Sequence, residues 1–157
     1  MSASVAPAAS PGDLAAVKAM FRAYADSLGF DLGFQDFEAE LADFPGTYAA
    51  PAGALLLARL DGEPVGAVGL RDLGEGVCEM KRLYLAPAAR GHGLGVKLVA
   101  RLVETAQAAG YRAMRLDTVP GHHDAAIGLY RKFGFVDIEA YCHNPIPGAR
   151  FMELALS

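Results

Sequence analysis

The most constraining feature of this sequence is the stretch Glu79–Gly95, which reads Glu-Met-Lys-Arg-Leu-Tyr-Leu-Ala-Pro-Ala-Ala-Arg-Gly-His-Gly-Leu-Gly. It predicts a β-strand, a short turn, a glycine-rich loop and the start of a helix. Glycine at every second position, Gly91, Gly93 and Gly95, removes side chains from the loop, so backbone N–H groups can surround a phosphate at the positive end of the helix. Arg90 adds a fixed positive charge. The stretch therefore predicts an anion site.

The spacing of the loop excludes the two commonest phosphate-binding motifs. The Walker pattern requires lysine followed by serine or threonine, whereas Lys97 is followed by leucine. The dinucleotide fingerprint requires a third glycine, but this chain has Val96 there if the pattern starts at Gly91 and Leu98 if it starts at Gly93. A glycine-rich turn between a strand and a helix, without a ligand, is the alternative to an anion site.

Two runs resemble the GNAT superfamily of N-acetyltransferases. Arg90-Gly91-His92-Gly93-Leu94-Gly95 fits its acetyl-CoA signature, Arg/Gln-x-x-Gly-x-Gly/Ala after a β-strand. Ala126-Ile127-Gly128-Leu129-Tyr130, followed by Phe133-Gly134-Phe135, resembles the family's second familiar run. The order of elements matches from about Ala54 onward. The resemblance implies an α/β fold (α+β in some schemes), with a mixed central sheet of six or seven strands flanked by helices. Strands four and five would splay apart to admit acetyl-CoA.

Periodicity and turn signals predict alternating helices and strands along one domain, residues 1–157, with residues 1–9 as a candidate flexible end. Ser10 resembles a helix cap, and Asp61-Gly62-Glu63-Pro64 predicts a hairpin turn. The predicted helices cover about 11–28, 34–44, the segment from the glycine loop to 110, and 124–133. The predicted strands cover about 54–60, 65–70, 77–85, 112–119, 136–142 and 150–156.

Composition limits the class of protein. With 157 residues, 53% apolar and 20% charged, the chain is typical of a soluble globular domain. No run is long enough for a membrane helix, and the Ala/Pro/Ser-rich start lacks the basic and apolar segments of a signal peptide. Two cysteines, Cys78 and Cys142, are too few for a disulfide framework. We expect both to be reduced, buried thiols in a cytoplasmic protein.

The net charge of −4 argues against nucleic acid as the main partner. Charge is unevenly distributed, however, because residues 77–101 carry a net +4. A basic patch on an acidic protein favours one local polyanion, such as the phosphates of CoA. Ordinary surface charge on a strand and a helix is the alternative explanation.

Acetyl transfer to an amine needs a general base, because an alkylammonium titrates near ~10.4 and the nucleophile must be neutral. Glu79 lies where the resemblance places the base glutamate of many family members; an ion pair with Lys81 or Arg82 is its alternative role. The leaving thiolate of CoA needs a proton. Tyr130 matches the family's general-acid tyrosine, and a packed core aromatic is its alternative role.

The resemblance also implies which residues bind acetyl-CoA. The residues that close the strand would bind the acetyl and pantetheine portions through their backbone, and the glycine loop would bind the phosphates. His123 stands where the family usually has a cofactor-binding asparagine, and it too can donate a hydrogen bond. The predicted set is Leu83, Tyr84, Leu85, Arg90, Gly91, His92, Gly93, Leu94, Gly95, Val96 and His123.

No metal site is expected. His122 and His123 are adjacent, so on a helix their side chains would point about 100° apart, and no spaced cysteine or histidine accompanies them.

The acetyl acceptor is less constrained by the sequence. Between Arg22 and Arg59 the chain has no lysine or arginine, and acidic residues alternate with phenylalanines. This pattern favours either an acidic, aromatic rim for a cationic amine or a solvated helix face. Arg71 and Arg82 could instead bind the carboxylate of an amino-acid-like acceptor. The acidic residues are Asp26, Asp31, Asp36, Glu38, Glu40 and Asp43.

The sequence therefore predicts an acetyl-CoA-dependent N-acetyltransferase that acetylates a primary amine of a small molecule by direct transfer in a ternary complex. Glu79 would be the base and Tyr130 the acid. A protein or peptide N-acetyltransferase and a non-catalytic CoA-binding sensor are the alternatives. Acetyl-CoA is the expected co-substrate, nucleic acid and membrane partners are not expected, and a homodimer is compatible with the family.

Overall fold

The computed structural model describes residues 2–28, 37–118 and 124–156. Its centre is a seven-stranded sheet in the order β1-β2-β3-β4-β5-β7-β6, in which β4 and β5 run parallel and the other neighbours antiparallel. The strands are β1 (Ala3–Pro7), β2 (Ala54–Leu60), β3 (Glu63–Gly74), β4 (Val77–Leu85), β5 (Ala113–Thr118), β6 (Val136–Ile138) and β7 (Arg150–Ala155). The predicted mixed sheet of six or seven strands is confirmed.

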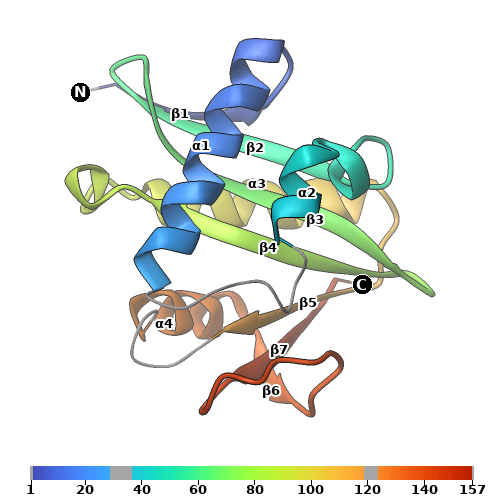
Figure 1. Ribbon diagram of the computed structural model, residues 1–157. Helices are drawn as coiled ribbons and strands as arrows, with labels where there is room; N and C mark the ends of the chain where they lie inside the picture. The colour runs from blue at the N-terminus through green and yellow to red at the C-terminus, as the bar shows by residue number, and fades with distance from the viewer. Residues whose placement is uncertain (1, 29–36, 119–123, 157) are drawn as a thin grey trace.

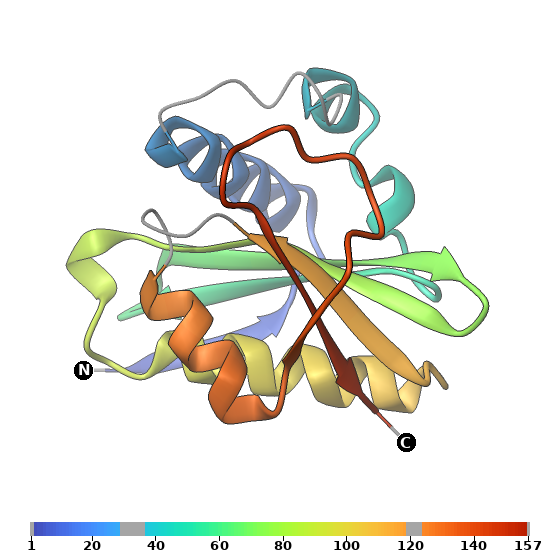
Figure 2. The same cartoon turned by 90° about the horizontal axis from the view of Figure 1, so that it is seen from below.

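Helices cover both faces of this sheet: α1 and α2 lie on one face, α3 and α4 on the other (Figures 1 and 2). Leu55 and Leu57 of β2 pack in the cluster beneath α1, whereas Leu56 packs with α3. Because successive side chains of a strand point to opposite faces, this apolar run is buried on both sides. The helices are α1 (Pro11–Leu28), α2 (Phe37–Ala42), α3 (Leu94–Ala108) and α4 (Asp124–Phe133), with 3-10 turns η2 (Gly46–Tyr48) and η3 (Pro87–Ala89). Among the described helices, none has the length and apolar character needed to cross a bilayer.

Strands β4 and β5 pair only at their beginnings and then diverge. Their registered pairs are Val77 with Ala113, Cys78 with Met114, and Glu79 with Arg115. Beyond these pairs, β4 continues to Leu85 and β5 to Thr118 without a shared ladder. Backbone groups that face this gap therefore lack a strand partner. The predicted splay is confirmed, and Glu79 lies where the gap opens.

Local sequence signals explain several element boundaries. Helix α1 begins with a capping box: the Asp13 N–H donates to Ser10 Oγ at 3.0 Å, and the Ser10 N–H donates to the Asp13 carboxylate at 3.4 Å. Strands β2 and β3 are joined by Asp61 and Gly62, whose φ angles are 51° and 85°. Positive φ at both central residues is typical of the type I′ turn that closes a two-residue hairpin.

Other predictions need correction. Strand β1 was not predicted, because its Ala/Ser/Pro composition carries little strand signal; its pairing with the edge of β2 defines it. The strand predicted over 136–142 ends at Ile138, the last residue registered with β7. The prediction that Cys142 is a buried residue is wrong: Cys142 is exposed as a residue, whereas Cys78 is buried, and both cysteines are free. The helix predicted over 34–44 begins, within the described residues, at Phe37 and ends at Ala42.

Gly69 of β3 lies directly beneath two buried aromatic rings. A Cβ atom there would lie 2.7 Å from Cε1 of Tyr48 and 3.3 Å from Cζ of Phe21. We expect Gly69→Ala to lower the free energy of unfolding by about 1–3 kcal/mol, because the rings must leave their packed positions. Gly128→Ala in α4 is the control, since its Cβ would meet nothing within 4 Å and should be neutral or stabilising. Urea denaturation measures the free energy of unfolding of both variants. If Gly69→Ala were as stable as the wild type, this packing would be contradicted.

Candidate active site

The glycine loop connects β4 to α3, as the sequence predicts. Gly91 and Gly93 have positive φ angles of 87° and 73°, and a Cβ atom at either position would meet nothing within 4 Å. The backbone conformation, rather than a lack of space, therefore favours glycine there. Gly93 is the N-cap of α3 and provides no side-chain cap. The first-turn N–H groups of α3 thus lack both intrahelical carbonyls and a capping side chain, as in an anion site.

A cleft of about 360 Å³ lies beside this loop. Leu83–Leu85, at the end of β4, form one wall, and Ala125, Ala126 and Leu129 of α4 contribute another. Arg90 lies at the same cleft, together with Ser27 and Gly95. Bare loop amides and an arginine suit a pyrophosphate, and apolar walls suit the chain that follows it in CoA.

The remaining predicted cofactor residues differ in what they can offer. Gly91, His92 and Gly93 are exposed on the loop, and Val96 is 50% exposed. The Leu94 side chain is buried in the core, so that residue can offer only its backbone. His123 lies outside the described residues.

A β-bulge interrupts β4 between its two functional segments. Ala67 is registered with Tyr84 and Gly69 with Lys81, so Arg82 and Leu83 together lie opposite a single residue of β3. Arg82 has a φ of 63°, which is unfavourable for a residue with a side chain. Backbone strain of this kind costs about 1–3 kcal/mol and persists where the surroundings enforce it.

The surroundings of Arg82 account for this bulge. Its Nε and Nη2 donate to the two carboxylate oxygens of Glu40 at 3.3 and 3.2 Å, and its guanidinium lies 4.9 Å from the ring centroid of Phe37. Burial alone would lower the pKa of Arg82, but the Glu40 carboxylate outweighs it and raises that pKa. Helix α2 therefore contacts the bulge through the Glu40 carboxylate and the Phe37 ring.

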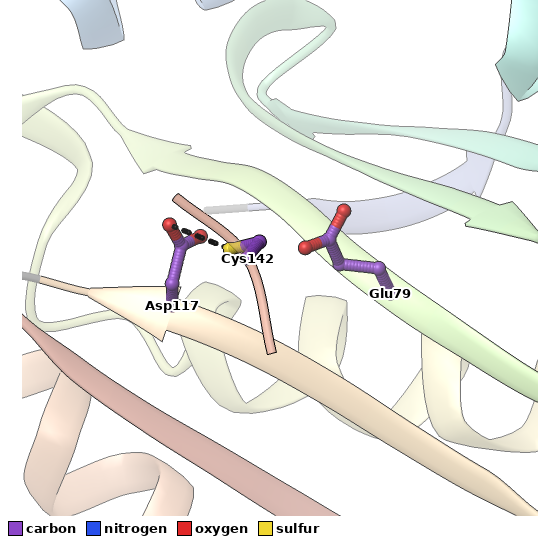
Figure 3. A group of neighbouring side chains, drawn as sticks. All are labelled: Glu79, Asp117 and Cys142. Carbon is purple, nitrogen blue, oxygen red and sulfur yellow. Dashed lines mark hydrogen bonds between the residues drawn. The ribbon is translucent and has the colours of Figure 1, made fainter. Parts of the chain in front are cut away.

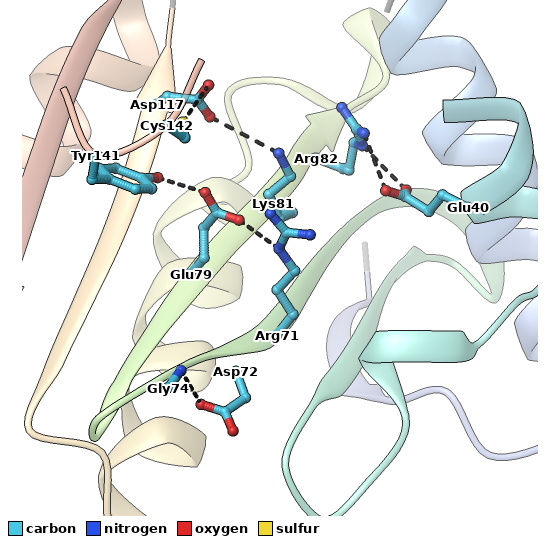
Figure 4. A network of polar contacts seen from close by, with 10 residues as sticks. All are labelled: Glu40, Arg71, Asp72, Gly74, Glu79, Lys81, Arg82, Asp117, Tyr141 and Cys142. Carbon is cyan, nitrogen blue, oxygen red and sulfur yellow. Dashed lines mark hydrogen bonds and ion pairs between the residues drawn. The ribbon is translucent and has the colours of Figure 1, made fainter. Parts of the chain in front are cut away.

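A second, polar pocket of about 210 Å³ lies at the splay. Glu79 from β4 and Asp117 from β5 face each other across the gap, with Cys142 between them (Figure 3). The charged lining consists of three carboxylates and three cationic side chains, which form ion pairs across the pocket (Figure 4). The lining residues are Glu40, Arg71, Glu79, Lys81, Arg82, Asp117, Cys142 and His143.

Glu79 is the most buried carboxylate of this pocket, with 1% of its side chain exposed. Arg71 Nε donates to its Oε1 at 2.6 Å, and the Tyr141 hydroxyl donates to its Oε2 at 2.6 Å. Arg71 is the residue registered opposite Glu79 in the β3–β4 hairpin, so this pair is a cross-strand contact. The alternative ion pair with Lys81 or Arg82 is not the contact found. Tyr141 was missed, since nothing near it in the sequence indicates that residues 139–149 fold back over β4.

Asp117 organises the other side of the pocket. Asn144 Nδ2 donates to its Oδ2 at 3.0 Å, and Lys81 Nζ lies 4.0 Å from its Oδ1. Burial lowers the pKa of Lys81, and the charge of Glu79 opposes that shift. Burial, and after it the charge of Asp117, raises the pKa of the Cys142 thiol to about 11, so this thiol stays protonated at neutral pH.

Glu79, Asp117 and Cys142 each place one potential metal ligand within 4.8 Å of the others. Their chemistry fits a metal ion poorly. The Cys142 thiol is protonated, and Lys81 and Arg71 bring positive charge into the same pocket. The three side chains are better described as part of the ion-pair network.

Tyr130 of α4 packs into the core beside this region. Its ring lies 5.7 Å from that of Phe135, and 6% of the residue is exposed. Burial raises the pKa of Tyr130, and the neighbouring Tyr24 and Asp117 raise it further. The hydroxyl therefore keeps its proton at neutral pH. Both the packed aromatic and the proton donor that the sequence suggests are compatible with this position.

Comparisons with known proteins agree with this architecture. Residues 17–135 match the family model described as the acetyltransferase (GNAT) family. An uncharacterized N-acetyltransferase of Schizosaccharomyces pombe is 41% identical over 149 residues, which cover 94% of this chain and 91% of the relative.

Two solved structures share the fold at low sequence identity. A GNAT-family acetyltransferase of Staphylococcus aureus aligns with a TM-score of 0.79 and 18% identity, covering 99% of this chain and 100% of that chain. YncA of Salmonella typhimurium, whose structure was solved with its cofactor acetyl-CoA, aligns with a TM-score of 0.75 and 21% identity, covering 100% of this chain and 95% of that chain. From the family match and the yeast relative, the chain belongs to the GNAT family of acetyltransferases.

Proposed function

We propose that this protein transfers the acetyl group of acetyl-CoA to a primary amine of a small molecule, directly and in a ternary complex. The observation that carries the proposal is that two different pockets share one strand. The cleft beside the glycine loop reaches Leu83–Leu85 of β4, and the polar pocket contains Glu79 of the same strand. A thioester in the first pocket and an amine in the second would meet near the bulge of β4.

Acetyl-CoA would be bound mainly by backbone donors. N–H groups of residues 91–96, with Arg90, would hold the pyrophosphate at the N-terminus of α3. Backbone groups of Leu83–Leu85 that lack a strand partner would bind the pantetheine and acetyl portions and stabilise negative charge on the carbonyl oxygen. His123 would add a hydrogen bond. Acetyl-CoA supplies an activated thioester, so the protein needs no nucleophile of its own.

Glu79 would accept the proton that the acceptor ammonium must lose, directly or through water. A carboxylate has about four lone-pair sites, so the hydrogen bonds from Arg71 and Tyr141 leave capacity for this proton. As the new C–N bond forms and the C–S bond breaks, Tyr130 would donate its proton to the departing sulfur. The nitrogen, positively charged once it has attacked, would lose a second proton, which restores the Tyr130 hydroxyl directly or through water, and Glu79 would release the first proton to solvent.

Release of free CoA from acetyl-CoA, measured across a panel of small amines with the purified chain, tests this function. We expect stoichiometric CoA release and acetylated amine with at least one class of small amine. Acetylation of peptide N-termini or lysines alone would favour the protein-modifying alternative. A thermal shift by acetyl-CoA without CoA release for any acceptor would favour the sensor alternative.

Arg90 provides a prediction specific to the co-substrate. Removing a charge-assisted hydrogen bond to phosphate costs about 1.5–3 kcal/mol of binding free energy in favourable sites. Because Arg90 is exposed, the lower end of this range applies to it. We expect Arg90→Ala to raise the KM for acetyl-CoA about tenfold, with the KM for the amine unchanged. Arg101→Ala on the exposed side of α3 is the matched control for loss of charge. Equal effects of the two substitutions would contradict a direct contact by Arg90.

A further inference from the structure

Arg71 and Arg82 line the same pocket but use their guanidinium groups differently. Arg82 engages both oxygens of Glu40 through two nitrogens. Arg71 donates to Glu79 through Nε alone, and within the described residues neither of its terminal nitrogens makes a hydrogen bond. Arg71 lines the pocket with its guanidinium beside Glu79 (Figure 4), and 35% of its side chain is exposed. Its terminal nitrogens therefore offer unused donors in the fork geometry that matches a carboxylate.

We propose that Arg71 binds a carboxylate of the acetyl acceptor, which makes the acceptor a zwitterionic, amino-acid-like molecule. This inference rests on the proposed function, since the acceptor amine is taken to face Glu79. The Nε atom, which binds Glu79, and the terminal nitrogens, which would bind the acceptor carboxylate, belong to one rigid guanidinium group. The distance between Glu79 and the bound carboxylate is therefore fixed. With ordinary hydrogen-bond lengths, the amine and the carboxylate of the acceptor would be separated by about one to three carbon atoms.

The charge balance of the pocket supports a zwitterion. Three carboxylates face three cationic side chains, and Glu79, Lys81 and Arg82 are all less than 10% exposed. An unpaired ammonium or an unpaired carboxylate would bring a net charge into a largely desolvated site, which is costly. A zwitterion brings both charges and leaves the pocket neutral.

The described residues give little support to an acidic rim for a purely cationic amine. Glu40 is the acidic residue from the early stretch that lines the pocket, and it is bound to Arg82. Glu38 pairs with Arg22 at the surface. Asp31 and Asp36 lie outside the described residues.

Matched acceptors test this proposal. The acceptor panel consists of the twenty common amino acids, β-alanine and γ-aminobutyrate. Each acid is compared with its own primary amide and its own decarboxylated amine, and kcat/KM is measured by CoA release. In the wild type we expect at least one acid to exceed its own amide by about 10- to 150-fold, the range that a charged hydrogen bond provides. In Arg71→Met we expect this ratio to fall to nearly one. A loss common to acid and amide reflects the contact with Glu79 and does not change the ratio.

Arg59→Met is the matched control, because Arg59 Nη2 donates to Asp13 at 2.7 Å in an ion pair outside both pockets, and its side chain is 32% exposed against 35% for Arg71. The acid-to-amide ratio should keep its wild-type value there. The proposal is overturned if the amides or decarboxylated amines react as well as the acids, or if Arg71→Met leaves the ratio unchanged; in either case acetyl transfer itself stands.

Binding of the same amino acids, measured calorimetrically with wild type and Arg71→Met, separates the two proposals. If no small amine releases CoA but an amino acid binds in a manner dependent on Arg71, the proposed transfer fails and the carboxylate site stands. If there is neither CoA release nor amino-acid binding, both proposals are wrong.

Discussion

Tyr130→Phe should lower kcat by about 10²- to 10⁴-fold while the dissociation constant for acetyl-CoA changes less than about twofold. The substitution removes the one proton that Tyr130 can donate to the departing sulfur. It keeps the ring that packs against Phe135, so the core and the cleft beside α4 retain their shape. The kcat is measured at saturating amine and acetyl-CoA, and the dissociation constant by calorimetry.

Two further measurements separate this role from a structural one. Tyr111→Phe is the control, because the Tyr111 hydroxyl bonds only the carbonyl of Ala52 within the described residues. It should keep the wild-type kcat. Because burial raises the pKa of Tyr130 above its ordinary value of 10.0, the wild-type rate should not fall at alkaline pH until beyond about pH 10. Equal losses of kcat and acetyl-CoA affinity, or a large loss of stability in Tyr130→Phe, would make Tyr130 a packing residue.

Local signals were sufficient for the parts of the fold that local interactions determine. The capping box at Ser10, the Asp61-Gly62 turn and the glycines before α3 all act within a few residues, and their structures match the predictions. Strand β1 depends on pairing with a distant partner, and its own composition carries almost no strand signal. Its existence therefore could not be inferred from the sequence.

The same distinction applies to the candidate site. The hairpin turn alone does not identify the partner of Glu79: with Gly74 paired to Val77, a regular ladder would place Asp72 opposite Glu79. A register shift between Asp72 and Gly74 places Arg71 there, whereas proximity along the chain favours Lys81 or Arg82. The contact with Tyr141 needs the chain after β6 to return across the splay, and no short-range pattern encodes that path.

Position and register together explain why one strand can serve two pockets. Glu79 is the last residue of β4 that pairs with β5, so its side chain lies where the gap opens. The bulge at Arg82 then changes the alternation of side chains along β4, and Leu83–Leu85 face the cleft beside α4. The Glu40 carboxylate contacts Arg82 at the bulge, which links α2 to the geometry of both pockets.

Glu79→Gln should lower kcat by about 10²- to 10⁴-fold near neutral pH, because glutamine cannot accept the ammonium proton. The matched control is Asp13→Asn, which removes a carboxylate from the ion pair with Arg59 outside both pockets and should leave kcat within about twofold. Glutamine also breaks the ion pair with Arg71, so some loss of stability is expected and thermal unfolding must accompany the kinetics.

The pH dependence of this defect identifies its cause. An alkylammonium titrates near ~10.4, so as the pH approaches 10 the acceptor loses its proton to water and no longer requires a base. The ratio of wild-type to Glu79→Gln rates should therefore shrink steadily as pH rises, and it should be smaller for acceptors whose amines are less basic. If Glu79 only holds Arg71 and Tyr141 in position, the ratio of rates would stay constant across pH and across acceptors. The effect of displaced side chains on the rate does not depend on whether the amine is protonated.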